Sequence, residues 1–406
     1  MRLWIVVYCI FSTFLTGFTQ TLPTARSTDW TLAGLRDTST SGFLEIDMQA
    51  YGAIDDGVTS NDSIISNALP SITGQGAVLQ FPGGDFLFNN TIVLPGNVVL
   101  RGQGALNTSF IMNLENAGHA ISVEGSSNAS DTTSLIQSAV KDSNYVMIVV
   151  TADFTIGDWL QIIQQDSHLV TSSWAENTVG QIAYIENIAG NKLVLASPLR
   201  MDFDMANSPY VRKIVPVKNV GIECLKIHRM DDTAPQQTSN VFFRYAVNCW
   251  IKDIESQNCT FSHIEMESSS NIHVSGSYIH HAFDYGGGGR AYGVMLHYTS
   301  NECLVEDNVF ERLRHAMIVQ AGANGNVFTY NYSFDPYWSS FPTNSAGDMV
   351  LHGNYPYANL FEQNICQNIV IDNSHGPNGP FNTFLRNRAE SYGEVVPNVR
   401  TEKVYS

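Results

Sequence analysis

The sequence predicts an all-β protein built as a parallel β-helix solenoid. Three observations predict this fold class. Asparagines recur in a fixed register over the second half of the chain, short apolar runs alternate with Gly, Pro and Asn corners, and only 15% of the residues are charged. A chain of 406 residues is long for one globular core but ordinary for a solenoid, in which each coil contacts only its neighbours.

Residues 1–20 are typical of a secretory signal peptide. Arg2 is the one charge in this segment, and the apolar run from Leu3 to Phe18 is short for a membrane span. We therefore expect a soluble protein that is secreted, or periplasmic, after cleavage of the signal. Residues 21–45 are expected to form an N-terminal linker.

The formal net charge of −17 argues against nucleic acid and anionic membranes as general partners. Such a charge also repels an acidic polysaccharide unless local arginines or a bound cation offset it. Five cysteines follow the signal segment, and none of them has C-x-x-C spacing, so we expect buried free thiols rather than a disulfide framework or a zinc site. These are Cys224, Cys249, Cys259, Cys303 and Cys366.

Residues 46–140 are expected to form an N-terminal cap and the first coils. The most specific motif is Tyr51-Gly52-Ala53-Ile54-Asp55-Asp56-Gly57. It is followed by apolar runs that end at Gly83-Gly84 and at Gly102-Gln103-Gly104. Such runs are typical of brief strands with tight corners. Between them, a stretch with roughly helical spacing predicts a short helix, through Ile64, Ile65, Ala68 and Leu69.

This text resembles the N-terminal cap of the pectate-lyase-like (pectin lyase) superfamily, which includes polygalacturonases, polysaccharide lyases and phage tailspikes. The resemblance implies a right-handed parallel β-helix whose first segment covers the open edge of the solenoid. It also implies a polysaccharide as the partner.

The sequence pattern changes over residues 141–215, and the new pattern predicts a small inserted β subdomain. Apolar or alternating runs at 146–150, 159–164, 181–186 and 192–195 are separated by turn signals. Trp159 and Trp174 are expected to fill the core of this subdomain. Alternatively, they line a sugar site together with Asp166 and His168.

The main coils, residues 216–406, carry two asparagine ladders. Asn308, Asn331, Asn364 and Asn387 are separated by 23, 33 and 23 residues, and a second row shows the same 33 and 23 at Asn326, Asn359 and Asn382. Ser277 and Ile254 extend the first register backward. The unit is thus 23 residues, with insertions of 8 residues after Ser277 and 10 after Asn331. Stacked amides can hydrogen-bond from coil to coil and satisfy groups that a tight turn leaves without partners.

This register predicts which polar residues share a column. Asp284 and His315 follow a ladder position by seven residues, and Asp348 follows Asn331 by seven once the 10-residue insertion is left out. This predicts a carboxylate, an imidazole and a carboxylate on three successive coils. His352 and His375 form a second column. Both insertions lie over this zone, and loops that interrupt a solenoid usually build its binding site. A slip of one residue would send the first column to the other face of its strands.

The resemblance and the columns favour a polysaccharide lyase that acts by β-elimination on a uronic-acid glycan. Such chemistry needs a base, a group that neutralises the carboxylate and an acid for the leaving oxygen. Asp284 and Asp348 are candidate Ca²⁺ ligands. The candidate catalytic residues are Asp284, His315, Asp348, His352, His375 and Arg314. The candidate substrate-binding residues are Arg290, Tyr292, Arg312, Trp338 and His281.

Two alternatives stay open. Asp284 and Asp348 lie two coils apart, about 9.6 Å along the axis, close to the upper end of the roughly 6.5–9.5 Å of an inverting hydrolase pair. The Asn-Thr-Asp text of polygalacturonases is missing from the coils, which disfavours that branch of the hydrolases. In the second alternative the protein binds a glycan without cleaving it, as an adhesin or a tailspike-like fibre.

Overall fold

The computed structural model describes residues 22–395 apart from 24–25, 36–39, 73, 75, 116–117, 232–236 and 373. The signal peptide expected over residues 1–20 lies outside the described residues. Within them, no helix combines the length and the apolar character needed to cross a bilayer.

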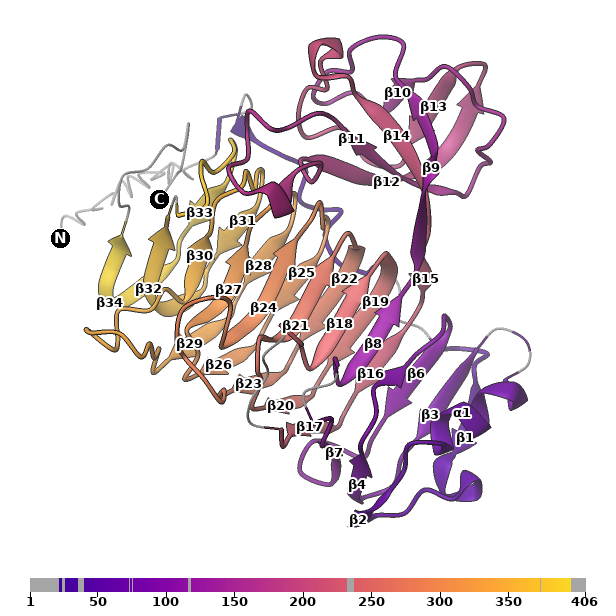
Figure 1. The fold of residues 1–406 in the computed structure, drawn as a ribbon, viewed down its shortest axis with the longest axis vertical. Coiled ribbons are helices and arrows are strands. Elements are labelled where there is room, and N and C mark those ends of the chain that lie inside the picture. Colours follow the sequence, from indigo (N-terminus) through magenta and orange to yellow (C-terminus); the bar gives the residue numbers. More distant parts are fainter. Residues whose placement is uncertain are drawn as a thin grey trace, which may run out of the picture.

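The chain folds into a right-handed parallel β-helix, as predicted, with two long sheets running along it (Figure 1). The 11-stranded sheet takes about one strand from each coil. It consists of β1 (Leu44–Asp47), β3 (Ala77–Gln80), β6 (Val98–Arg101), β15 (Val217–Lys218), β16 (Gly221–Glu223), β19 (Ala246–Lys252), β22 (Ser270–Ser275), β25 (Leu304–Glu306), β28 (Val327–Thr329), β31 (Leu360–Glu362) and β33 (Thr383–Leu385).

The 17-stranded sheet forms the rest of each coil as two adjoining rows. The first row holds β2 (Asp56–Ser60), β4 (Gly84–Phe88), β7 (Thr108–Met112), β17 (Lys226–Arg229), β20 (Glu255–Gln257), β23 (Tyr278–His280), β26 (Val309–Glu311) and β29 (Tyr332–Phe334). The second holds β5 (Ile92–Val93), β8 (Ile121–Glu124), β18 (Val241–Arg244), β21 (Ser262–Glu267), β24 (Tyr292–His297), β27 (His315–Val319), β30 (Met349–Leu351) and β34 (Arg388–Val395). The long strand β32 (Ile365–Ile371) pairs with both rows.

Apolar side chains that point into the coils form one continuous core along the solenoid. Phe328, Phe361 and Phe384 stack on successive coils, with ring centroids 4.9 and 4.7 Å apart. The expected cap is present at the N-terminal end, with η2 (Met48–Tyr51), α1 (Ile64–Ala68) and η3 (Leu69–Ser71). The single turn α1 buries Ile64, Ile65 and Ala68 against that core, so the short helix predicted from the spacing is confirmed.

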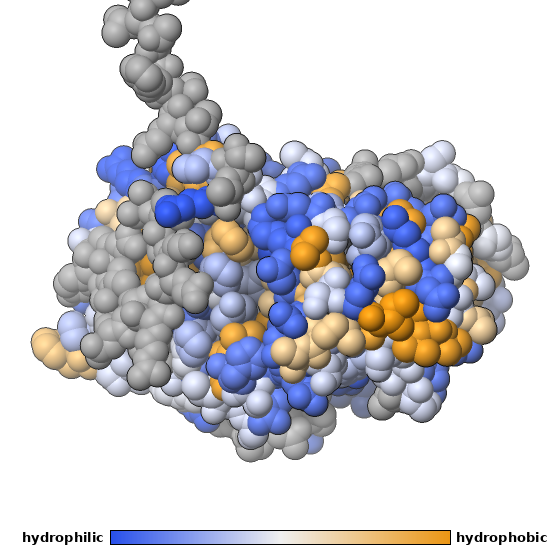
Figure 2. Space-filling model, turned by 90° about the horizontal axis from the view of Figure 1, so that it is seen from above, coloured by the Kyte–Doolittle hydropathy of each residue, from blue (hydrophilic) through white to orange (hydrophobic). Residues whose placement is uncertain are grey.

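The inserted subdomain is a six-stranded antiparallel sheet with its own core. It consists of β9 (Ser126–Ser134), β10 (Tyr145–Met147), β11 (Trp159–Ile163), β12 (Gly180–Ala189), β13 (Lys192–Leu195) and β14 (Tyr210–Val215), with turns η4 (Ser173–Ala175) and η5 (Met205–Asn207). The insertion starts at Ser126 rather than at residue 141, because β9 pairs with β14 and not with a coil. Figure 2, seen from above, shows hydrophilic and apolar areas interspersed over this face, with the largest apolar area in the right half of the view.

Both predicted asparagine ladders are confirmed. The Nδ2 atoms of Asn308, Asn331 and Asn364 donate to the Oδ1 atoms of the next asparagine at 3.0, 2.9 and 2.9 Å, ending at Asn387. The second ladder shows the same bonds at 2.9 and 3.0 Å. Each of these side chains also donates to a backbone carbonyl, so the amides are saturated inside the turns. The cysteines are free, as predicted.

We expect Asn331→Ala to lower stability by about 2–4 kcal/mol, because it leaves two buried N–H groups of Asn308 without their acceptor and removes one of the two donors to Asn364 Oδ1. Asn387→Ala, at the end of the same ladder, should cost less because it has a ladder neighbour on one side only. Thermal unfolding followed by circular dichroism compares the two variants. Equal losses would contradict a cooperative role for the ladder.

Candidate functional site

A groove of about 830 Å³ crosses the outward face of the second row of the 17-stranded sheet. Its floor is made by side chains of β8, β18, β21 and β24. The Gly288-Gly289 turn lines one part of the groove, and Ser374 and His375 line another. Trp174, from the turn η4 of the inserted subdomain, also lines it. The groove thus lies where the coils, their loops and the insertion come together.

A column of charged side chains runs along the groove floor because the strands pair in register. Glu124 of β8 lies beside Arg244 of β18, Arg244 beside Glu267 of β21, and Glu267 beside His297 of β24. Arg244 Nη2 lies 2.5 Å from Glu124 Oε2, and Arg244 Nη1 lies 4.0 Å from Glu267 Oε1. Glu265 faces the same side as Glu267 because side chains alternate along a strand.

Glu265, Glu267 and His297 form the most polar cluster of the groove, and one donor atom from each lies within 4.8 Å of the other two. Ser239 Oγ donates to Glu265 Oε2 at 2.5 Å. His297 is 4% exposed, and Nε2 lies 3.1 Å from Glu265 Oε1 without hydrogen-bonding geometry. Among the described residues neither ring nitrogen of His297 has a hydrogen-bond partner.

The two carboxylates differ in environment. Burial raises the pKa of Glu267 above the ordinary value of a glutamate, and the nearby His297 and Arg244 offset this only in part. A carboxyl group with a raised pKa keeps its proton to a higher pH and can act as an acid. The same three side chains are also a donor set that suits a divalent cation.

Aromatic rings wall the groove. Trp174 contacts Tyr298 and His375 edge-on, with centroids 5.9 and 5.7 Å apart. His119 stacks flat on Phe242 at 4.1 Å. Trp174 is 42% exposed, so its ring is available to a ligand. Aromatic faces beside polar groups provide an apolar surface and hydrogen-bonding partners side by side.

Histidines continue the site toward the C-terminal coils. His315 and His352 lie 5.6 Å apart, and His352 and His375 lie 4.9 Å apart, between ring centroids. Burial by itself raises the pKa of Asp372, but the hydrogen bond from His352 Nδ1 to Asp372 Oδ2, 2.8 Å long, helps hold that pKa at about 2. Burial, followed by the charge of Arg314, holds the pKa of His315 well below its ordinary value.

The structure brings four of the predicted residues into the groove: Tyr292, Arg314, His352 and His375. Arg314 lies over the ring of Tyr292, with its guanidinium carbon 5.6 Å from the centroid, and donates to the carbonyl of Gly286 at 2.8 Å. His315 touches the rings of Tyr292 and His352 from beneath the groove lining. His352 and His375, predicted as a second column, are in ring contact, but the strand register places Asp372 rather than His375 beside His352.

The predicted column of Asp284, His315 and Asp348 is wrong. His315 pairs in register with Tyr292 of the preceding coil, and its Nδ1 lies 2.9 Å from the carbonyl of Gly347 in the next. The 8-residue insertion shifts the count: Asp284 belongs to the loop that precedes β24, not to the strand.

Asp348 lies on the other side of the sheet from His315. It is 2% exposed and accepts hydrogen bonds from Ser333 Oγ at 2.5 Å and from the N–H groups of Gln367 and Asn368. Asp284 pairs with Arg290 in the loop. The two carboxylates therefore do not fit a shared Ca²⁺ site.

The other predicted residues lie outside the groove lining. Arg312 pairs with Asp335 at 2.9 Å, and Trp338 lies 5.9 Å from the guanidinium carbon of Arg314. His281 Nδ1 lies 2.9 Å from His280 Nδ1 in the first row of the sheet. In the inserted subdomain, Asp166 accepts three backbone N–H groups at 177–179 and is a structural residue.

Sequence reasoning missed Glu265, Glu267 and His297, which form the centre of the groove. A signal for the two glutamates was present, because polar and apolar residues alternate from His263 to Glu267 and place both carboxylates on one face. His297 gave no comparable signal. The insertion that precedes it hides the coil to which it belongs.

Comparison with known proteins agrees with this fold. The family model "Rhamnogalacturonase A/epimerase, pectate lyase-like" matches residues 46–155, which confirms the resemblance predicted from the cap. No curated protein sequence matches the chain.

Among solved structures, the chain is similar to the tailspike protein gp49 from Pseudomonas phage LKA1, with 16% identity over 84% of this chain and 59% of that one, and a TM-score of 0.62. It is also similar to the tailspike of E. coli bacteriophage HK620, solved in complex with a hexasaccharide, with 12% identity over 89% of this chain and 55% of that one, and a TM-score of 0.51. The chain spans little more than half the length of these tailspikes. At such identities the likeness shows the fold alone.

We expect Asp348 to make stability depend on pH. Burial raises the pKa of Asp348 from 3.8 to about 6, so the folded protein binds this proton more tightly than the unfolded chain. The free energy of unfolding should therefore fall as the pH rises from about 4 to about 6, by roughly 3 kcal/mol.

Asp348→Asn should flatten this dependence, because the amide can donate to Ser333 Oγ and its oxygen can still accept from the backbone. Chemical denaturation at several pH values between 4 and 7.5 measures the effect. Asp335→Asn, which changes an exposed carboxylate, should keep the slope. An unchanged slope in Asp348→Asn would contradict the assignment.

Proposed function

We propose that the protein is a secreted polysaccharide-cleaving enzyme that hydrolyses a glycosidic bond in the groove. Glu267 is the acid that protonates the leaving oxygen. Glu265 is the carboxylate that attacks the sugar, because an oxygen of each glutamate lies within 4.8 Å of the other and this separation leaves no room for the water of an inverting pair. The observation that carries this proposal is the pair of carboxylates on one strand, inside an aromatic-walled groove, of which one has a raised pKa.

The family-model match and the likeness to tailspikes support a polysaccharide as the partner. The groove supports the same partner independently. Its volume of about 830 Å³ accommodates a chain of a few sugar units, and it is open rather than closed over a small molecule. Trp174 and Tyr298 offer ring faces, while Gln320, Ser374 and the histidines offer hydrogen bonds to hydroxyl groups.

Two carboxylates in different protonation states are what glycoside hydrolysis requires. Protonated Glu267 donates its proton to the glycosidic oxygen as the bond to the anomeric carbon breaks. Glu265, held by Ser239 Oγ, attacks the anomeric carbon as that bond breaks, and water then hydrolyses the bond between sugar and Glu265. His297 packs against both carboxylates, with Nε2 3.1 Å from Glu265 Oε1, and so helps to position them.

A second candidate is the β-elimination favoured by the sequence. The stacked Arg314 and Tyr292 support it, since an arginine can neutralise a uronate and a tyrosine can take or give a proton. Two observations favour hydrolysis over it. Burial raises the pKa of Tyr292, which disfavours the phenolate form that a base needs. The acidic side chains that line the groove, Glu124, Glu265 and Glu267, outnumber its two arginines, and Arg244 is already paired with Glu124, so the groove does not favour an acidic sugar.

We expect Glu267→Gln to lower kcat about 10²–10⁴-fold on polysaccharides, since a positioned acid contributes a factor of this size. The parent should lose activity as the pH rises through the raised pKa of Glu267, and this alkaline decline should disappear in the variant. Aryl glycosides with good leaving groups need no acid, so the variant should keep more activity on them. Glu306→Gln, on the 11-stranded sheet, is the matched control.

New reducing ends released from a panel of neutral and acidic polysaccharides measure this activity. Absorbance near 235 nm in the same tubes, with and without a chelator, reports elimination and any dependence on a cation. A signal at 235 nm that does not depend on Glu267 would replace hydrolysis by elimination. Binding without either product would replace both by a glycan-binding protein.

A further inference from the structure

A second cavity, of about 550 Å³, lies on the opposite side of the solenoid, against the outer face of the 11-stranded sheet. We propose that it is a second carbohydrate-binding site, built to hold a segment of an acidic glycan away from the groove. It shares no lining residue with the groove. The proposal goes beyond the proposed hydrolysis, because the cavity would bind a glycan whatever chemistry the groove performs.

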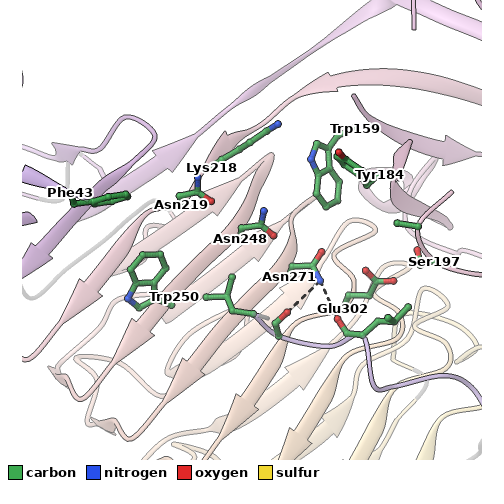
Figure 3. A pocket seen from close by; sticks show the side chains of 14 residues that line it. Phe43, Trp159, Tyr184, Ser197, Lys218, Asn219, Asn248, Trp250, Asn271 and Glu302 are labelled. Carbon is green, nitrogen blue, oxygen red and sulfur yellow. Dashed lines mark hydrogen bonds between the residues drawn. The ribbon is translucent and has the colours of Figure 1, made fainter. Parts of the chain in front are cut away.

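Three parts of the chain that are distant in sequence build this cavity (Figure 3). The coils supply Lys218, Asn248 and Trp250, and the inserted subdomain supplies Trp159 and Tyr184. The segment before β1, called the N-terminal arm here, closes one side through Leu32, Gly34, Leu35 and Phe43. The arm is fixed in place: Gly34 N–H donates to the carbonyl of Glu302 at 2.8 Å, and Asn271 Nδ2 donates to the carbonyl of Leu32 at 3.1 Å. The space is therefore preformed.

Two tryptophans stand on either side of the cavity, with Asn248 between them in Figure 3. Trp159 and Tyr184 make an edge-to-face pair with centroids 5.6 Å apart. Trp250 is held by a hydrogen bond of 2.5 Å from Nε1 to Glu223 Oε1. A Cβ added at Gly221 would lie 2.4 Å from the indole, so glycine on the preceding coil lets this ring lie close to the sheet.

A row of amides runs across the floor between the tryptophans. Asn219, Asn248 and Asn271 lie on successive coils, since the residues before them, Lys218, Val247 and Ser270, are paired in register. Neighbouring coils place these amides about 4.8 Å apart. All three have positive φ, of 59°, 56° and 52°, which explains asparagine as a turn residue.

A role in the turn does not explain why the side chain of Asn248 has no hydrogen-bond partner among the described residues. Asn219 donates to Asn97 at 2.8 Å and Asn271 donates to the arm, whereas the amide of Asn248 makes no hydrogen bond to the part of the chain that the structure describes. Its donor and acceptor both face the space between the two tryptophans. Trp159 and Trp250 are only 7% and 4% exposed and offer ring edges, so the amide of Asn248 is the group that can hydrogen-bond to a sugar hydroxyl here.

The charge at the cavity favours an acidic sugar. Glu302 lines the cavity, but its carboxylate is paired with the buried guanidinium of Arg200. Lys218, in contrast, has no ion pair within the described residues. It leaves a local positive charge on a protein whose formal net charge is −17. A uronate or sulfate group would be drawn to this position.

Two sites on one protein raise the effective concentration of a polymer at each of them. We expect Lys218→Gln and Asn248→Gly each to weaken binding of polygalacturonate oligosaccharides 3–10-fold. Glycine is used at position 248 because it tolerates the positive φ. Matched controls are Lys252→Gln, an exposed lysine of the same sheet, and Asn258→Gly, a turn asparagine with φ of 57° outside the cavity.

Isothermal titration measures binding in the full chain and in a Trp174→Ala background, which weakens the groove. Binding that persists in that background and falls with Lys218→Gln or Asn248→Gly, but not with the controls, supports the second site. Equal losses in the controls, unchanged binding in both cavity variants, or no binding to the parent would overturn it. If the protein hydrolyses a polysaccharide but the cavity variants bind the oligosaccharides as the parent does, only the second site is overturned. If the protein binds the oligosaccharides but cleaves no polysaccharide, only the proposed hydrolysis is overturned.

Discussion

The hydrogen bonding of each coil to the next is the interaction on which the rest of this structure depends. Backbone ladders join the strands, and the amides of Asn308, Asn331, Asn364 and Asn387, of which the first three are buried, join the turns between them. Each asparagine side chain can make all of its hydrogen bonds in only one alignment of its coil with the neighbouring coils. The ladders therefore hold the coils in a single alignment, and every outward-facing column is defined relative to them.

That alignment explains how polar groups gather in the groove. Glu124, Arg244, Glu267 and His297 come from four strands spread over more than 170 positions, yet they form one line because their strands pair in register. Opposite charges alternate along most of this line. The cost of desolvating Glu267 is relieved only in part, which leaves its pKa raised, and this is the property that an acid catalyst needs.

The inserted subdomain contributes a wall to both cavities. It docks on the coils through specific bonds, from Gln161 Nε2 to Thr299 Oγ1 at 2.9 Å and from Tyr357 OH to the carbonyl of Gly180 at 2.7 Å. Trp174 then lies beside the groove, and Trp159 beside the cavity on the other sheet. Both rings had been expected to fill the core of the subdomain. Trp174 is exposed instead, whereas Trp159 is buried and packs with Ile182 and Ile214 of the subdomain and with Val247 of the coils. Burial of polar contacts between subdomain and coils keeps the two walls in place.

The sequence by itself determined the solenoid, its 23-residue unit, the positions of both insertions, the capped N-terminus and the free thiols, because each depends on local chemistry repeated at a fixed spacing. Only the tertiary structure decided the site. A strand turns its side chains to alternate faces, so an insertion that shifts the count moved Asp284 into a loop and left Asp348 inside the coil. Glu265, Glu267 and His297 meet only through the pairing of strands across that insertion, a contact that no spacing in the sequence displays.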